Sequence, residues 1–138
     1  MKLFIFGSTG DLVKKKVLPA LEEIKELEII NIGRKNMDND QFNEEHCKNC
    51  SSKLKERLTY KQINFNKDFC EECTSLLNKE AENYFYISLP PSLIYTTLLE
   101  ISTLKEKGYK IRVLIEKPFG NSLEEAEKLR KMIIKKKS

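Results

Sequence analysis

The sequence predicts a doubly wound α/β domain, in which helices cover both faces of a mainly parallel sheet. The first observation is an alternation along the chain, because short apolar runs are followed each time by stretches with helical apolar spacing. Buried parallel strands have such continuous apolar runs, and their crossover connections are usually helices. The second observation is size, since 138 residues with 40% apolar and 33% charged side chains fit one globular domain over residues 1–138.

The first strand is predicted at residues 2–6, where the chain is apolar up to a glycine. A helix is predicted over 12–27, with Pro19 expected to interrupt or restart it. Residues 29–32 form the second strand, again a short apolar run. The apolar face of the first helix consists of Leu18, Leu21, Ile24 and Leu27.

The middle of the chain repeats this pattern. After a polar loop, a helix is predicted over residues 40–58, and alternating apolar residues predict a third strand at 60–65. A helix over 69–80 and a fourth strand at 84–89 follow, and the strand is ended by Pro90 and the proline after it.

The last predicted elements lie between residue 92 and the C-terminus. A helix over 92–107 ends at Gly108, and the continuous apolar run 111–115 is typical of a central strand. Ser122 and Glu125 then form a capping box in front of a final helix.

Composition excludes several classes of function. Lys and Arg exceed Asp and Glu by 25 to 21, and the two signs alternate on the predicted helices, so they largely cancel. No apolar run approaches the roughly 18 residues of a membrane span, and the N-terminal run reaches Gly7 too early for a signal peptide. We therefore expect a cytoplasmic protein that binds neither nucleic acid nor membrane.

A glycine-containing turn follows the first strand. Gly7, Ser8, Thr9 and Gly10 stand where the first helix of a doubly wound domain begins, and such an N-terminus favours an anion. Gly7 would let the backbone approach a pyrophosphate, and Gly10 would let helix and strand pack closely. Because Ile5 replaces the first glycine of a G-x-G-x-x-G motif, a purely structural turn is the alternative.

The end of the second strand indicates which dinucleotide would bind. NAD-binding domains usually have an acidic residue there for the ribose 2′-OH, whereas this chain has Arg34 and Lys35 after Gly33. A guanidinium can bind a 2′-phosphate through two hydrogen bonds. We therefore predict NADP over NAD, with a solvated loop residue as the alternative for Arg34.

Three segments resemble, in order, motifs of the glucose-6-phosphate dehydrogenase family. They are GSTGDLVKKKVLPAL at 7–21, FYISLPP at 85–91 and RVLIEKPFG at 112–120, which contains the highly specific E-K-P-F-G motif. The resemblance covers essentially the whole chain, although residues 37–81 match only in their expected elements. It implies a Rossmann-type, NADP-binding N-terminal domain of a pentose phosphate pathway oxidoreductase, which passes hydride from carbon 1 of glucose 6-phosphate to NADP.

The resemblance also implies the roles of individual residues. Arg34 would bind the 2′-phosphate of NADP, and Leu89-Pro90 would lie along the cofactor. Lys16 and Lys117 match lysines that face the phosphorylated sugar or the cofactor, with Lys117 as the catalytic candidate. Pro118 matches a proline associated with a cis bond and with movement between domains. The pyrophosphate would be held by Gly7, Ser8, Thr9, Gly10, Asp11 and Leu12.

The chain departs from the family at its C-terminal end. The family's enzymes are several times longer, and a later segment of the R-I-D-H-Y-L-G-K-E type provides the histidine general base. This chain ends at Ser138 before that segment, and its single histidine, His46, cannot be assigned as the base. We therefore expect no useful oxidation of glucose 6-phosphate by this chain alone. Two explanations would account for the missing segment. The chain could be part of a longer or split enzyme, with a separate chain supplying the substrate domain, or it could be a reduced domain with a binding role.

All four cysteines fall in two C-x-x-C pairs, Cys47/Cys50 and Cys70/Cys73, separated by residues 51–69. This spacing is typical of a structural zinc site, because two close pairs complete a tetrahedron of thiolates. Reduced thiols and disulfides are the alternatives, and disulfides are disfavoured in a cytosol. A zinc site supports a rival function, a non-catalytic zinc-stabilised module that binds nucleotides or another protein.

Overall fold

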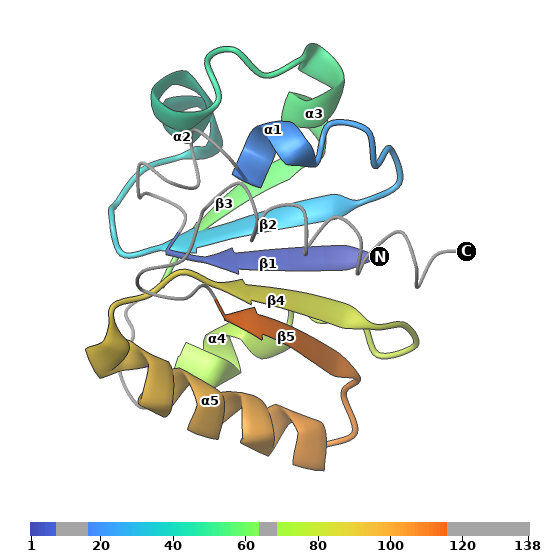
Figure 1. Cartoon of the computed structure of the whole chain (residues 1–138), viewed down its shortest axis with the longest axis vertical. Helices are drawn as coiled ribbons and strands as arrows, with labels where there is room; N and C mark the ends of the chain where they lie inside the picture. The colour runs from blue at the N-terminus through green and yellow to red at the C-terminus, as the bar shows by residue number, and fades with distance from the viewer. Residues whose placement is uncertain (8–16, 64–68, 116–138) are drawn as a thin grey trace.

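The computed structural model describes residues 1–7, 17–63 and 69–115, and 69–71 and 91 only through their backbone. Five strands form one sheet in the order β3-β2-β1-β4-β5 (Figure 1). All four pairs of neighbouring strands are parallel, which confirms the predicted parallel sheet. The strands are β1 (Lys2–Phe6), β2 (Glu28–Gly33), β3 (Leu58–Gln62), β4 (Asn83–Ile87) and β5 (Ile111–Ile115).

Helices cover both faces of this sheet (Figure 1). One face carries α1 (Leu18–Ala20), α2 (Asn39–His46) and α3 (Ser52–Glu56). The other carries α4 (Phe69–Thr74) and α5 (Pro91–Glu106). Within the described ranges, no helix has the length and apolar content needed to cross a membrane.

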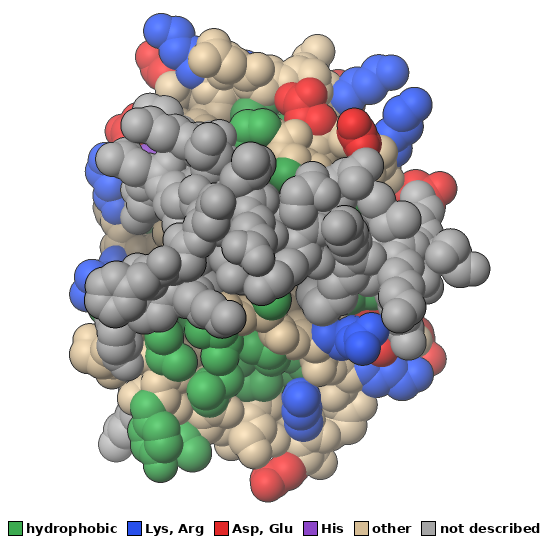
Figure 2. All heavy atoms as spheres, in the orientation of Figure 1, with side chains coloured by type: hydrophobic (Ala, Val, Ile, Leu, Met, Phe, Trp, Pro, Cys, Tyr) green, Lys and Arg blue, Asp and Glu red, His purple; other side chains and the backbone are tan. Residues whose placement is uncertain are grey.

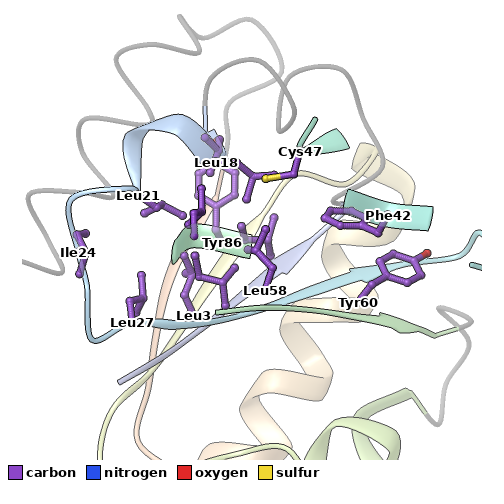
Figure 3. Close-up of a cluster of buried hydrophobic side chains, with 14 of the residues drawn as sticks. Leu3, Leu18, Leu21, Ile24, Leu27, Phe42, Cys47, Leu58, Tyr60 and Tyr86 are labelled. Atoms are coloured by element: carbon purple, nitrogen blue, oxygen red, sulfur yellow. The ribbon is translucent and has the colours of Figure 1, made fainter. Parts of the chain in front are cut away.

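The core is divided by the sheet into two apolar clusters. Successive side chains of a strand point to opposite faces, so Leu3 and Ile5 enter the cluster beneath α1–α3, whereas Phe4 and Phe6 enter the cluster beneath α4 and α5. All four are fully buried. Figure 3 shows the first cluster, to which β1, β2, β3, β4 and the α1–α3 segments contribute. Burial on both faces explains why β1 is a continuous apolar run.

Side chains of both charges occur on the face of the molecule that Figure 2 shows. Figure 2 shows Lys and Arg interspersed with Asp and Glu around the margins of the visible face, as the alternation in sequence predicted. Hydrophobic side chains gather in the lower half of this view, where α5 and β5 lie. Three large apolar side chains of α5 are exposed, namely Tyr95, Leu98 and Leu99.

The predicted first helix is only partly present. In its described portion, helix is confined to α1, with Pro19 in its first turn, where a missing N–H is tolerated. The chain then continues through turns in which the N–H of Leu21, Ile24 and Leu27 each donates to the carbonyl three residues earlier. These turns keep the four apolar residues, Leu18 included, in the core. The apolar side chains that recur every third residue from Leu18 to Leu27 therefore lie on consecutive turns as well as on a helix.

The predicted helix over 40–58 is broken. The N–H of Cys47 closes the last turn of α2, and the side chain of Ser51 accepts a hydrogen bond from the N–H of Leu54 to begin α3. Leu58 already belongs to β3, whose described part ends at Gln62. Similarly, α4 ends at Thr74, earlier than predicted. The final helix predicted from residue 122 lies outside the described residues.

Candidate functional site

The strand order locates a candidate site at the carboxyl edge of the sheet. From β1 the chain moves outward to β2 and β3, and it then crosses back to β4 and β5 on the other side of β1. Ligands of open α/β sheets bind outside the carboxyl ends of the strands at such a reversal. The segments at this point are the turn that begins at Gly7 and the residues that follow β4 (Figure 1).

Gly7 is fixed between the ends of the two strands that flank β1. Its N–H donates to the carbonyl of Ile32 at 2.9 Å, and the N–H of Ser88 donates to the carbonyl of Phe6 at 3.0 Å. Its φ is +87°, and an added Cβ would lie 2.2 Å from the carbonyl oxygen of Ser88. Only glycine fits this position. A structural reason for Gly7 therefore exists beside the predicted approach of a pyrophosphate.

Leu89 and Pro90 follow β4 on the other side of this turn. Leu89 is half-buried and packs on the apolar cluster beneath α4 and α5, and one of its methyl groups would lie 3.4 Å from a Cβ at Gly7. Pro90 is exposed and precedes the first turn of α5. The structure thus brings Gly7 and Leu89 together, as the predicted cofactor site requires.

Arg34 and Lys35 extend beyond the carboxyl end of β2, and both are exposed. The Lys35 ammonium pairs with Glu45 of α2 at 2.9 Å. No carboxylate among the described residues pairs with the Arg34 guanidinium. Arg34 is therefore an exposed cation at the carboxyl edge of the sheet, and no described carboxylate forms an ion pair with it.

The backbone of this tip is bound to β3 in a way that sequence analysis missed. Gln62 donates its side-chain N–H to the carbonyl of Arg34 at 3.1 Å, and the Tyr60 hydroxyl donates to the carbonyl of Lys35 at 2.6 Å. Burial raises the pKa of Tyr60 above the ordinary value of a phenol. Tyr60 and Gln62 are two residues apart, so they lie on the same face of β3. This spacing is the only sign in the sequence that both side chains could reach the backbone at Arg34 and Lys35.

Several predicted site residues lie outside the described ranges. These include most of the residues assigned to the pyrophosphate and both lysines assigned to the sugar phosphate, so their roles stay predictions. They are Ser8, Thr9, Gly10, Asp11, Leu12, Lys16, Lys117 and Pro118.

The two cysteine pairs do not come together in the way a zinc site requires. Cys47 and Cys50 form a disulfide with a Cα–Cα distance of 5.0 Å. Cys47 belongs to the cluster beneath α1–α3, whereas Cys73 is a buried free thiol in the cluster on the opposite face of the sheet. The side chain of Cys70 lies outside the described residues.

The topology explains this correction to the predicted zinc site. The connection from β2 to β3 runs over one face and the connection from β3 to β4 over the other, because the strand order reverses after β3. Among the described side chains, no group of three or more potential metal ligands occurs. The first pair is instead a disulfide, the alternative that the expected cytosolic location disfavoured. His46, beside it, packs on the ring of Phe42 with centroids 5.0 Å apart.

Comparison with known proteins identifies the family. Residues 4–137 match the model of the family described as "Glucose-6-phosphate dehydrogenase, NAD binding domain". The chain belongs to the glucose-6-phosphate dehydrogenase family. This N-terminal domain of the family binds a nicotinamide dinucleotide, so the prediction of a dinucleotide cofactor is confirmed.

Individual relatives agree with this assignment. Glucose-6-phosphate 1-dehydrogenase of Cyberlindnera jadinii is 32% identical over 95% of this chain and 31% of its own length. The enzyme of Encephalitozoon cuniculi is 34% identical over 90% of this chain and 27% of its own length. The crystal structure of glucose-6-phosphate 1-dehydrogenase from Mycobacterium avium shares the fold, with a TM-score of 0.72 at 21% identity, over 96% of this chain and 33% of that one.

The chain therefore spans about a third of the length of these family members. The matched part is the dinucleotide-binding domain, as the three motifs predicted. Neither the comparisons nor the described residues support the rival zinc-stabilised module.

Proposed function

We propose that this chain binds NADP, in preference to NAD, as the cofactor-binding part of an enzyme that oxidises glucose 6-phosphate. The observation that supports NADP most directly is Arg34, an exposed cation at the carboxyl end of β2 that no described carboxylate neutralises. NAD-binding domains place an acidic residue at this position, which would repel a 2′-phosphate. A guanidinium instead matches the geometry of a phosphate.

The described residues fit a dinucleotide at this edge. The N–H of Gly7 donates to the carbonyl of Ile32, which lies two residues before Arg34. Leu89 offers apolar surface beside Gly7. Gly7 would thus lie near the pyrophosphate and Arg34 near the 2′-phosphate.

The reaction of the complete enzyme follows from the family. The chemistry that the bound cofactor supplies is acceptance of a hydride from carbon 1 of the sugar, while the hydroxyl proton passes to a base and the lactone forms. Lys16 and Lys117 are proposed to face the sugar phosphate, and no described residue is proposed as the base. Three further statements stay predictions. They are a separate chain that supplies the substrate domain, a cytoplasmic location, and the absence of activity in this chain alone.

The test is a fluorescence titration of the 138-residue chain with NADPH and with NADH. We expect tighter binding of NADPH. The Arg34→Ala variant should weaken NADPH binding by about 10- to 100-fold, as loss of charge-assisted hydrogen bonds predicts. It should leave NADH binding and the free energy of unfolding nearly unchanged, because the side chain is exposed.

Arg112→Ala is the matched control. Arg112 is also exposed, but it lies near the amino end of β5, where it pairs with Glu82 at 3.7 Å. Its removal changes the net charge equally and should leave both affinities unaltered. Equal affinities for NADPH and NADH in the unaltered chain, or no binding of either, would overturn the proposed function.

A further inference from the structure

The geometry points to Tyr60 and Gln62 of β3 as positioning residues that determine how well Arg34 discriminates NADP from NAD. This inference rests on the proposed function, because it concerns the same 2′-phosphate. Neither side chain is proposed to touch the cofactor. Both act on the backbone from which the Arg34 side chain extends.

Three successive carbonyls at the end of β2 accept hydrogen bonds from β3 or the residue directly after it. The carbonyl of Gly33 accepts from the N–H of Ile63 at 2.9 Å, which continues the pairing of the two strands. The next two, of Arg34 and Lys35, accept from side chains, Gln62 at 3.1 Å and Tyr60 at 2.6 Å. The backbone beyond β2 is thus bound although the strand pairing has ended.

Tyr60 is itself fixed from the side of α2. Its N–H donates to the side-chain oxygen of Asn39 at 2.6 Å, and its ring stacks on Phe42 with centroids 5.2 Å apart. Figure 3 shows the two rings side by side at the margin of the first apolar cluster. Tyr60 is only 7% exposed. A buried ring held at both ends presents its hydroxyl to the Lys35 carbonyl in a fixed place.

The physical consequence is preorganisation of the tip. An exposed arginine on a free loop would lose backbone and side-chain entropy on binding a phosphate, and that loss weakens binding. Holding the carbonyls of Arg34 and Lys35 removes part of this cost before the cofactor arrives. Lys35 is also kept toward Glu45 by their ion pair. The benefit concerns only the 2′-phosphate, which NADH lacks.

The experiment measures the ratio of two affinities. In the Tyr60→Phe chain we expect the dissociation constant for NADPH to rise about three- to tenfold, the value of one hydrogen bond. Gln62→Met keeps the length of the side chain but removes its donor, and it should act in the same direction. The dissociation constant for NADH should stay unchanged. Titration with 2′,5′-ADP against ADP should give the same selective loss without a nicotinamide ring.

Tyr84→Phe is the matched control. It removes a buried phenol hydroxyl from the same apolar cluster, near the amino end of β4, and that hydroxyl has no hydrogen-bond partner among the described residues. It should leave the ratio of affinities unchanged. If Tyr60→Phe does not fold, the exposed Gln62→Met variant decides the inference.

The outcomes separate this inference from the proposed function. If the unaltered chain prefers NADPH and both variants weaken NADPH and NADH equally or not at all, the two side chains are only structural and the inference is overturned. If the unaltered chain shows no preference, the proposed function fails first, and the inference fails with it. A selective loss for NADPH and 2′,5′-ADP supports both.

Discussion

Two arginines at opposite edges of the sheet are used in opposite ways. Arg57, near the amino edge, donates to the backbone carbonyls of Ile24, Leu27 and Glu22, and burial lowers its pKa although Glu22 acts in the opposite direction. Arg34, at the carboxyl edge, is exposed, and only its backbone is held. At the amino edge the guanidinium of Arg57 thus holds a loop through its carbonyls. At the carboxyl edge only the backbone of Arg34 is held, and its guanidinium stays exposed. This is the division expected when ligands bind at the carboxyl ends of parallel strands.

Other side chains of the amino edge follow Arg57. Asn83 donates to the carbonyls of Asn78 and Lys110, at 2.8 and 3.1 Å, and Lys2 donates to the carbonyl of Leu76 at 2.6 Å. The bonds to Lys110 and Leu76 join segments that are distant in the sequence. Substitutions should therefore reduce stability at the amino edge and alter binding at the carboxyl edge, with Gly7 as the exception.

The largest effect on stability is expected for Gly7→Ala. The added methyl group would overlap the Ser88 carbonyl at 2.2 Å, and the φ of +87° is strained for alanine. Steric overlap and backbone strain together should lower the free energy of unfolding by about 3–5 kcal/mol, measured by urea denaturation.

Gly108→Ala separates the two causes. Gly108 follows α5 at the amino edge with a φ of +99°, but an added Cβ there meets nothing within 4 Å. Its cost should be that of strain alone, about 1–2 kcal/mol. Equal costs at the two glycines would show that the contact with Ser88 does not require glycine.

Removal of the amino-edge arginine is expected to reduce stability less than Gly7→Ala does. Arg57→Ala removes the guanidinium donor from the carbonyls of Ile24, Leu27 and Glu22, and among the described residues only the Ile24 carbonyl keeps another donor, the N–H of Leu27. The free energy of unfolding should therefore fall by about 2–3 kcal/mol. NADPH affinity should not change under conditions in which the variant is folded. Arg34→Ala should show the reverse pattern, with a stability change within about 0.5 kcal/mol. A loss of NADPH affinity in folded Arg57→Ala would contradict the division between the edges.

The smallest effect concerns alkaline pH. Burial raises the pKa of Tyr60 above its ordinary value of 10.0. The folded state therefore holds the phenol proton more tightly than the unfolded state, and this contribution to stability is fully present below pH 10. It is lost as the pH rises through the folded-state pKa. Urea denaturation from pH 9 upward should show a shallower loss of stability in Tyr60→Phe than in the unaltered chain, and parallel curves would contradict this.

Much of the fold followed from local patterns. The apolar runs of β1 and β2 were visible because strands buried on both faces contain few polar residues. The run at 111–115 was wrongly interpreted as a central strand, because β5 stands at the end of the strand order and only Ile111 in it is buried. The second predicted helix continued past Cys47, where α2 in fact ends. No glycine or proline marks that break, and the N-cap of α3 at Ser51 was missed. Turns with a period of three residues near Leu21 were also mistaken for helix. In both cases a local pattern fits two backbone conformations that only packing distinguishes.

The family, the parallel sheet and the position of Arg34 at the end of β2 could be predicted from the sequence, since motifs and strand ends are local properties of the chain. Which distant residues meet depends on the tertiary structure. It separated Cys47 from Cys73 by the sheet, placed the Ser88 carbonyl against Gly7, and brought the Tyr60 hydroxyl to the carbonyl of Lys35. These contacts depend on strand order and on the face of each crossover, which spacing along a chain does not contain.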